Sequence, residues 1–252
     1  MSKRFKGKPC AYCPGGVSET GDHVFARKFF PVRMRANLPQ VPACDKCNNE
    51  KSALEAYLAT ILLFGGRHAD ALENLVASGE RRLAKNSKLH RQLISGKERI
   101  WVPDQAGLLV PTMSVPIADD VFTRYFVFVI KGLLRYEFGE TLGNDDFVDV
   151  QTITTDGGEP IYRRFLNLNA AARTTRDIGN GAFVYEGSRA ADNGHVSIWL
   201  LTVFGGLAFQ DVDGRHYEAR IGAMTGPKRV ADKVALRQKW AQGLGPLRQI
   251  GP

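Results

Sequence analysis

All four cysteines of the 252-residue chain occur in two C-x-x-C pairs, Cys10/Cys13 and Cys44/Cys47. A C-x-x-C turn brings two thiolates to one side of a tight loop, so two such turns can supply four sulfurs to a tetrahedral zinc ion. Disulfides are unusual in a cytosolic chain, and a redox C-x-x-C normally occurs as a single pair. The spacing therefore predicts a structural zinc site, because four thiolates leave no coordination position open for a substrate.

The segment between the two pairs carries the side chains that could react. Asp22 and His23 are adjacent in ETGDHVFARKFF, which we expect to form two short strands around a turn. Asn48 directly follows Cys47, on the first turn of an expected helix, so a zinc ion would fix its position. Asp22 and Asn48 could then bind one divalent cation through oxygen atoms, as magnesium and manganese prefer. His23 would point to the other side of its strand and remain free to act as a base.

Taken together, these motifs resemble an HNH endonuclease, the ββα-metal nuclease module, and specifically the four-cysteine subgroup that includes phage Holliday-junction resolvases. The resemblance covers residues 8 to 55 and includes the cysteine pairs, the Asp-His pair, Asn37 in NLPQVPAC, and both Asn48 and Lys51 in CDKCNNEK. It implies that Asp22 and Asn48 ligate the catalytic metal. It also implies that His23 activates the attacking water and that Asn37 orients the loop carrying this histidine.

The reaction expected from this assignment is hydrolysis of a phosphodiester with one Mg²⁺ or Mn²⁺ ion, beside the structural Zn²⁺. Lys and Arg outnumber Asp and Glu by 34 to 26, which gives a net charge of +8 and favours a polyanionic partner. Arg27, Lys28 and Lys51 are the nearest candidates for phosphate contacts. We therefore expect a nucleic-acid endonuclease, with DNA as the favoured substrate.

Two other functions are compatible with the same residues. One is a non-catalytic zinc module that binds nucleic acid or a protein, in which Asp22 and His23 are incidental. The other is an RNA-cleaving effector. Metal-dependent cutting that is lost in a His23→Ala variant would exclude the first, and a comparison of DNA with RNA substrates would test the second.

The whole chain is expected to have an α+β fold with three parts. Residues 1–66 form the treble-clef-like ββα-metal module, which ends in a helix over NNEKSALEAYLATILLF that stops at Gly65 and Gly66. Residues 67–98 form a basic helical connector, a helix over residues 68–94 broken near Ser78 and Gly79. Residues 99–252 form an α+β domain with an antiparallel sheet, whose role could be substrate selection or dimerisation.

Within this last part, Val, Ile, aromatic residues and Gly turns predict strands. The expected strands are RIWV, GLLVPTMSVPIA, FVDVQTIT, PIYRRFL, AFVYEG, HVSIWLLTVF and LAFQDV. DDVFTRYFVFVIKGLLRYEFG is expected to form an apolar helix, with Asp119 or Asp120 at its N-cap and Gly139 after its end. GPKRVADKVALRQKWAQGL is expected to form a short basic helix.

The sequence also bears on location and assembly. The basic N-terminus MSKRFKGKPC is not followed by the apolar stretch of a signal peptide, and no run of about eighteen apolar residues occurs. We therefore expect a cytoplasmic protein without a membrane span. A homodimer is compatible with the expected function, because a single-site module that cuts both strands usually works as a dimer.

Overall fold

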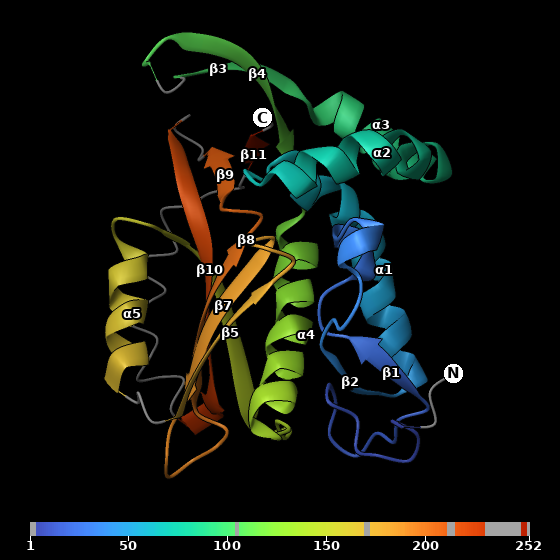
Figure 1. The fold of residues 1–252 in the computed structure, drawn as a ribbon, viewed down its shortest axis with the longest axis vertical. Helices are drawn as coiled ribbons and strands as arrows, with labels where there is room; N and C mark the ends of the chain where they lie inside the picture. The colour runs from blue at the N-terminus through green and yellow to red at the C-terminus, as the bar shows by residue number, and fades with distance from the viewer. Residues whose placement is uncertain (1–3, 104–105, 169–171, 211–214, 230–247, 251–252) are drawn as a thin grey trace.

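A computed structural model of the chain describes residues 4–103, 106–168, 172–210, 215–229 and 248–250. The described part is a mixed helix and sheet structure, in agreement with the expected α+β class. Its helices and strands form layers (Figure 1), and the N-terminal elements lie on one side of the larger sheet. No helix among the described residues is both long and apolar enough to cross a membrane.

The N-terminal part consists of a two-stranded antiparallel sheet and a long helix. These elements are β1 (Thr20–His23), β2 (Gln40–Ala43) and α1 (Asp45–Phe64). Helix α1 starts directly after Cys44, before the expected start, and ends at Gly65 as predicted. The order strand, strand, helix is compatible with a ββα-metal module, and that assignment stays a prediction.

The prediction of a second strand within ETGDHVFARKFF is wrong. After β1 the chain leaves the sheet and forms two 3-10 turns, Arg27–Phe29 and Val32–Met34, and the strand that pairs with β1 is β2. The reason is burial, because Phe25, Phe29 and Phe30 are each 0% exposed. Burying three aromatic rings in the core stabilises this segment more than a short strand pairing would.

The rest of the chain contributes a nine-stranded sheet to the described structure. Its strands are β3 (Glu98–Pro103), β4 (Leu109–Pro116), β5 (Asp146–Thr154), β6 (Arg173–Ile178), β7 (Phe183–Arg189), β8 (Ser197–Val203), β9 (Leu207–Gln210), β10 (His216–Pro227) and β11 (Arg248–Ile250). They pair antiparallel in the order β3-β4-β11-β9-β10-β8-β7-β6, and β5 pairs with β10. The sequence did not predict β6, β10 or β11.

Four further helices accompany the sheet in the described residues. They are α2 (Ala69–Lys85), α3 (Ser87–Gly96), α4 (Asp119–Phe138) and α5 (Gly158–Leu168). Helix α4 ends before Gly139, whose φ of 75° is left-handed as a helix C-terminus often requires. Its N-cap is Ala118, one residue before the expected Asp119.

Two predictions in these segments are wrong, one of the position of a helix break and one of a strand. The break between α2 and α3 falls at Asn86, whose side chain accepts a hydrogen bond from Leu89 N and so caps α3, while Gly79 remains buried within α2. PIYRRFL is not a strand but lies in α5, because Tyr162 and Leu166 are spaced by one helical turn and are both buried. The expected C-terminal basic helix covers residues 226–244, of which Gly226 and Pro227 are the end of β10 and those from 230 on lie outside the described part.

Helix α4 lies between the sheet and the N-terminal elements, and α5 covers the opposite face of the sheet (Figure 1). One apolar core includes residues from all three parts of the expected domain division, such as Leu58, Leu89 and Trp199. Phe29 packs against Phe183 and Tyr125, which joins the loop between β1 and β2 to the sheet and to α4. The N-terminal elements are therefore held by shared packing as well as by their cysteines.

Candidate functional site

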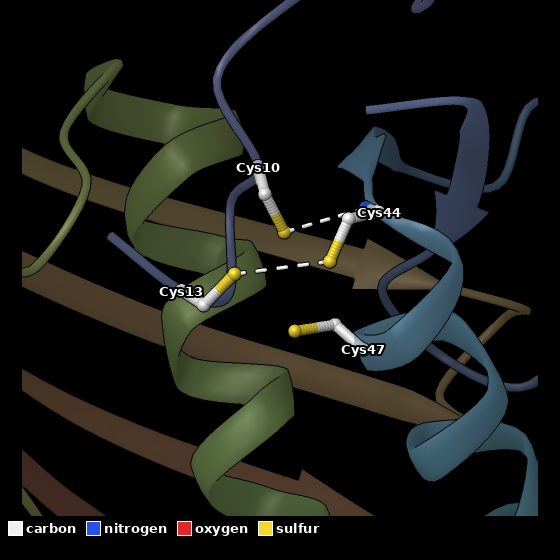
Figure 2. Close-up of side chains that lie close together, drawn as sticks. All are labelled: Cys10, Cys13, Cys44 and Cys47. Carbon is white, nitrogen blue, oxygen red and sulfur yellow. Dashed lines mark hydrogen bonds between the residues drawn. The ribbon is translucent and has the colours of Figure 1, made fainter. Parts of the chain in front are cut away.

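The four cysteines meet where the N-terminal loop approaches the start of α1 (Figure 2). Their sulfur atoms all lie within 4.8 Å of one another, and Sγ of Cys13 is 3.7 Å from Sγ of Cys44. Zinc–sulfur bonds of about 2.3 Å in a tetrahedron require sulfurs about 3.8 Å apart. The cysteines are thus positioned to bind a metal ion, and the set fits the predicted structural zinc.

The backbone around the cysteines is also suited to a metal. The amide groups of Tyr12 and Cys44 both donate to Sγ of Cys10, at 3.4 Å each. A Cβ atom at Gly16 would come within 2.5 Å of Sγ of Cys13, so this position has room only for glycine. Burial raises the pKa of Cys13 to about 11. A bound cation would displace the thiol protons and bind the four thiolates. Its affinity would be favoured because the four sulfurs are already close together.

Asp22 of β1 lies in a buried polar cluster between the β1–β2 sheet and α1. The Tyr12 hydroxyl donates to Oδ2 of Asp22 at 2.6 Å, and Nζ of Lys51 lies 3.0 Å from the same oxygen. Lys51 also donates to the His23 carbonyl oxygen at 2.6 Å and pairs with Glu55 one turn further along α1. Because both contacts to the Asp22 carboxylate are made to Oδ2, the other oxygen is the one that could bind a cation.

Lys51 was expected to contact a phosphate, but its side chain lies inside the protein. Its side chain is 0% exposed, so in this arrangement the ammonium group neutralises Asp22 and Glu55 and does not reach a phosphate. The other two residues expected at phosphates, Arg27 and Lys28, are exposed just after β1. The carbonyl oxygen of Lys28 accepts hydrogen bonds from α2, so this short segment is fixed while its side chains face solvent.

His23 is half-buried at the end of β1, and it is paired across the two-stranded sheet with Gln40 of β2. Nε2 of the His23 ring lies 2.7 Å from Nε2 of Gln40. Burial lowers the pKa of His23, and the positive charge of Arg27 lowers it further, against an opposing effect of Asp22. A lowered pKa keeps the imidazole neutral near pH 7, as a general base requires. If Nδ1 of the His23 ring is the atom that takes a proton, Nε2 must carry the hydrogen of the neutral imidazole. The Gln40 side-chain amide must then face Nε2 with its oxygen, which accepts that hydrogen.

Asn48 and Asn37 occupy different kinds of position. Asn48 is partly buried on α1, three residues before Lys51, and residues with this spacing lie on the same helix face. In the described structure the side-chain contacts of Asp22 are to Tyr12 and Lys51 rather than to Asn48. Asn37 is exposed in the loop before β2 with a φ of 60°, and the contact to the His23 ring comes from Gln40.

Sequence reasoning therefore missed the residues that support the site. Tyr12 lies between Cys10 and Cys13, and the C-x-x-C motif gives no indication of a role for the residues between its cysteines. Gln40 could have been found only by assigning β2 as the partner of β1. The pairing of Lys51 with Glu55 has the i, i+4 spacing of a helix ion pair, which is a usable sequence signal.

Comparison of the chain with protein-family models, with curated proteins and with solved structures found no match. The functional interpretation therefore depends on the motifs and the contacts described above.

Proposed function

We propose that the protein is a metal-dependent endonuclease that hydrolyses phosphodiester bonds in DNA. The observation that best supports this proposal is the position of Lys51. Its ammonium group bonds both the Asp22 carboxylate and the His23 carbonyl oxygen, so α1 packs directly across β1. Asn48 lies three residues before Lys51 in α1, so we expect the two side chains to share the helix face that meets β1.

In the proposed reaction His23 takes a proton from the attacking water, and its lowered pKa leaves the imidazole able to do so near neutral pH. A Mg²⁺ or Mn²⁺ ion bound by Asp22 and Asn48 would supply positive charge to the scissile phosphate and to the departing oxygen. Tyr12 and Lys51 orient the Asp22 carboxylate through one of its oxygens. Arg27 and Lys28 are exposed beside the site and can contact neighbouring phosphates.

One observation favours the non-catalytic alternative, a zinc module that only binds nucleic acid or a protein. The Asp22 side chain is 10% exposed and already has a cationic partner in Lys51, as a purely structural carboxylate would. The two functions differ in what they require of His23. A catalytic base is essential to the reaction, whereas a structural histidine affects only stability.

The test is a cleavage assay with purified protein on duplex DNA, branched DNA and RNA, each with Mg²⁺ or Mn²⁺. We expect DNA to be cut, and the His23→Ala variant to cut more slowly by a factor of about 10² or more. Zinc content and thermal unfolding of that variant should match the parent. His216→Ala changes an exposed histidine on β10, serves as the matched control and should cut normally.

Equal cutting by the His23→Ala variant and the parent would refute the catalytic assignment. Cutting of RNA with no cutting of either DNA would instead support the RNA-cleaving effector. Absence of cutting on every substrate, with nucleic-acid binding retained, would support the non-catalytic module.

A further inference from the structure

Strands β3 and β4 form a two-stranded ribbon that extends beyond the helical layers (Figure 1). They pair antiparallel from Glu98 opposite Ser114 to Pro103 opposite Leu109. Paired residues of antiparallel strands lie on the same face, and successive residues alternate between faces. Residues 99, 101, 109, 111 and 113 therefore share one face of the ribbon.

This face of the ribbon is exposed and largely apolar. Trp101 is 54% exposed, Leu109 is 64% exposed and Met113 is 45% exposed. The guanidinium carbon of Arg99 lies 5.6 Å from the centre of the Trp101 ring, which places a positive charge within the same face. A cluster of exposed apolar side chains on a projecting ribbon is typical of an interaction site.

The chain that leads into the ribbon is strongly basic. Residues 81–99 contain seven basic side chains and one acidic side chain, which is Glu98. The basic residues are Arg81, Arg82, Lys85, Lys88, Arg91, Lys97 and Arg99. Most of them are exposed on α2 and α3, and α3 packs against β4 next to the ribbon. The apolar face is thus accompanied by positive charge.

The basic helices also connect to the proposed nuclease site. Asn74 and Arg82 of α2 donate to the carbonyl oxygen of Lys28, at 2.9 Å and 2.8 Å. Arg82 also donates to the carbonyl oxygen of Ala59 in α1. These contacts hold α2 against the segment that follows β1. Helix α2 has three acidic residues, Asp70, Glu73 and Glu80, ahead of its three basic ones, so its positive charge lies at the C-terminal end that precedes α3.

We propose that the β3–β4 ribbon inserts its apolar face into the minor groove of duplex DNA and bends it, while α2 and α3 contact flanking phosphates. Leu, Met and Pro side chains that enter this groove unstack a base step, and basic residues supply affinity that does not depend on sequence. A second copy of the chain is a poorer partner, because each copy carries a net charge of +8. The choice of DNA rests on the proposed function, but the binding mode does not require cleavage.

The test measures binding and bending without cleavage. The His23→Ala protein is titrated onto a short duplex that carries fluorescence donor and acceptor groups at its two ends. Energy transfer should rise on binding, because bending brings the ends closer. Leu109→Ser/Met113→Ser should abolish this rise and weaken binding about tenfold. Leu168→Ser, which changes a residue that is 69% exposed on α5, is the matched control and should behave as the parent.

A second variant separates the basic helices from the ribbon. Lys88→Ala/Arg91→Ala should weaken binding and reduce the slope of log affinity against log salt by about two, with bending unchanged at saturation. Unchanged bending and affinity in the ribbon variant would overturn the proposal. A ribbon variant that instead converts a dimer to a monomer in sedimentation would overturn it in favour of a second copy. A parent protein that bends DNA but does not cut it would refute only the nuclease function.

Discussion

Replacing Lys51 with methionine should destabilise the protein strongly. The lysine side chain is 0% exposed, and its two carboxylate partners, Asp22 and Glu55, are 10% and 13% exposed. The substitution leaves both carboxylates in a nearly dry site without their cation, whereas the apolar volume of the side chain is kept. We expect the free energy of unfolding to fall by about 3–5 kcal/mol, as observed when one partner of a buried ion pair is removed.

The distances in the cluster support this magnitude. Nζ of Lys51 is 3.0 Å from Oδ2 of Asp22, and at an effective dielectric constant of about 20 this attraction is worth about 5 kcal/mol. Glu55 adds a second attraction. In the variant no ammonium group has to be buried, and this recovers several kcal/mol of the lost attraction. The net loss is therefore smaller than the sum of the two attractions.

The loss should depend on pH. Burial raises the pKa of Glu55, and the Lys51 charge counteracts this effect, so removing the charge raises the pKa of Glu55 further. A carboxyl group whose pKa is higher in the folded state than in the unfolded state destabilises the fold as pH rises through the folded pKa. The destabilisation by Lys51→Met should thus be greatest at about pH 8 and smaller at about pH 5.

Urea unfolding followed by the fluorescence of the buried Trp199 measures these differences. Lys46→Met changes an exposed lysine on the same helix, and it should alter the free energy of unfolding by less than about 0.5 kcal/mol. The double variant Lys51→Met/Glu55→Leu should be more stable than Lys51→Met, because one uncompensated carboxylate is gone. A loss under about 1 kcal/mol in Lys51→Met at pH 8, or a double variant less stable than the single one, would refute the reasoning.

Two further predictions concern the His23 base and the cysteine site. Arg27→Ala should raise the pKa of His23 toward its ordinary value of about 6.5, measured by NMR titration of the ring, and should move the acidic limb of the cleavage profile to higher pH because the base acts unprotonated. Lys28→Ala is the control, and equal pKa values in all three proteins would contradict the proposed role of Arg27. Cys13→Ser should weaken zinc binding and lower the thermal unfolding temperature, as measured by zinc release to a colorimetric chelator. Zinc affinity equal to that of the parent would show that the four sulfurs do not act together.

Local signals in the sequence were enough to locate several elements. The two C-x-x-C pairs predicted the sulfur cluster, and glycines at 65 and 139 marked the ends of α1 and α4. Each C-x-x-C turn and each helix end is determined by residues within a few positions of one another, and the matched spacing of the two pairs indicated that they share one site. The α+β class followed from the same kind of evidence, because helical and strand patterns alternate along the chain.

Features that depend on distant contacts were not predictable in this way. The loop after His23 has the composition of a strand, but its rings pack on residues more than ninety positions later, such as Tyr125 and Phe183. PIYRRFL has strand-forming residues, yet the face that packs against the sheet follows a helical spacing. In the site, Asp22 contacts Tyr12 and Lys51, which are 10 and 29 residues away in the sequence. No local sequence motif predicts these contacts.

The same contacts suggest how the proposed site could keep its geometry. Asn48 lies between Cys47, which is part of the sulfur cluster, and Lys51, which is bonded to both Asp22 and the His23 backbone. A metal ion at the cysteines would hold the first turn of α1, and the buried ion pair holds the second. Loss of either one would free this part of the helix to move relative to β1. Zinc removal and Lys51→Met should therefore impair cleavage in similar ways, although neither change touches the His23 base.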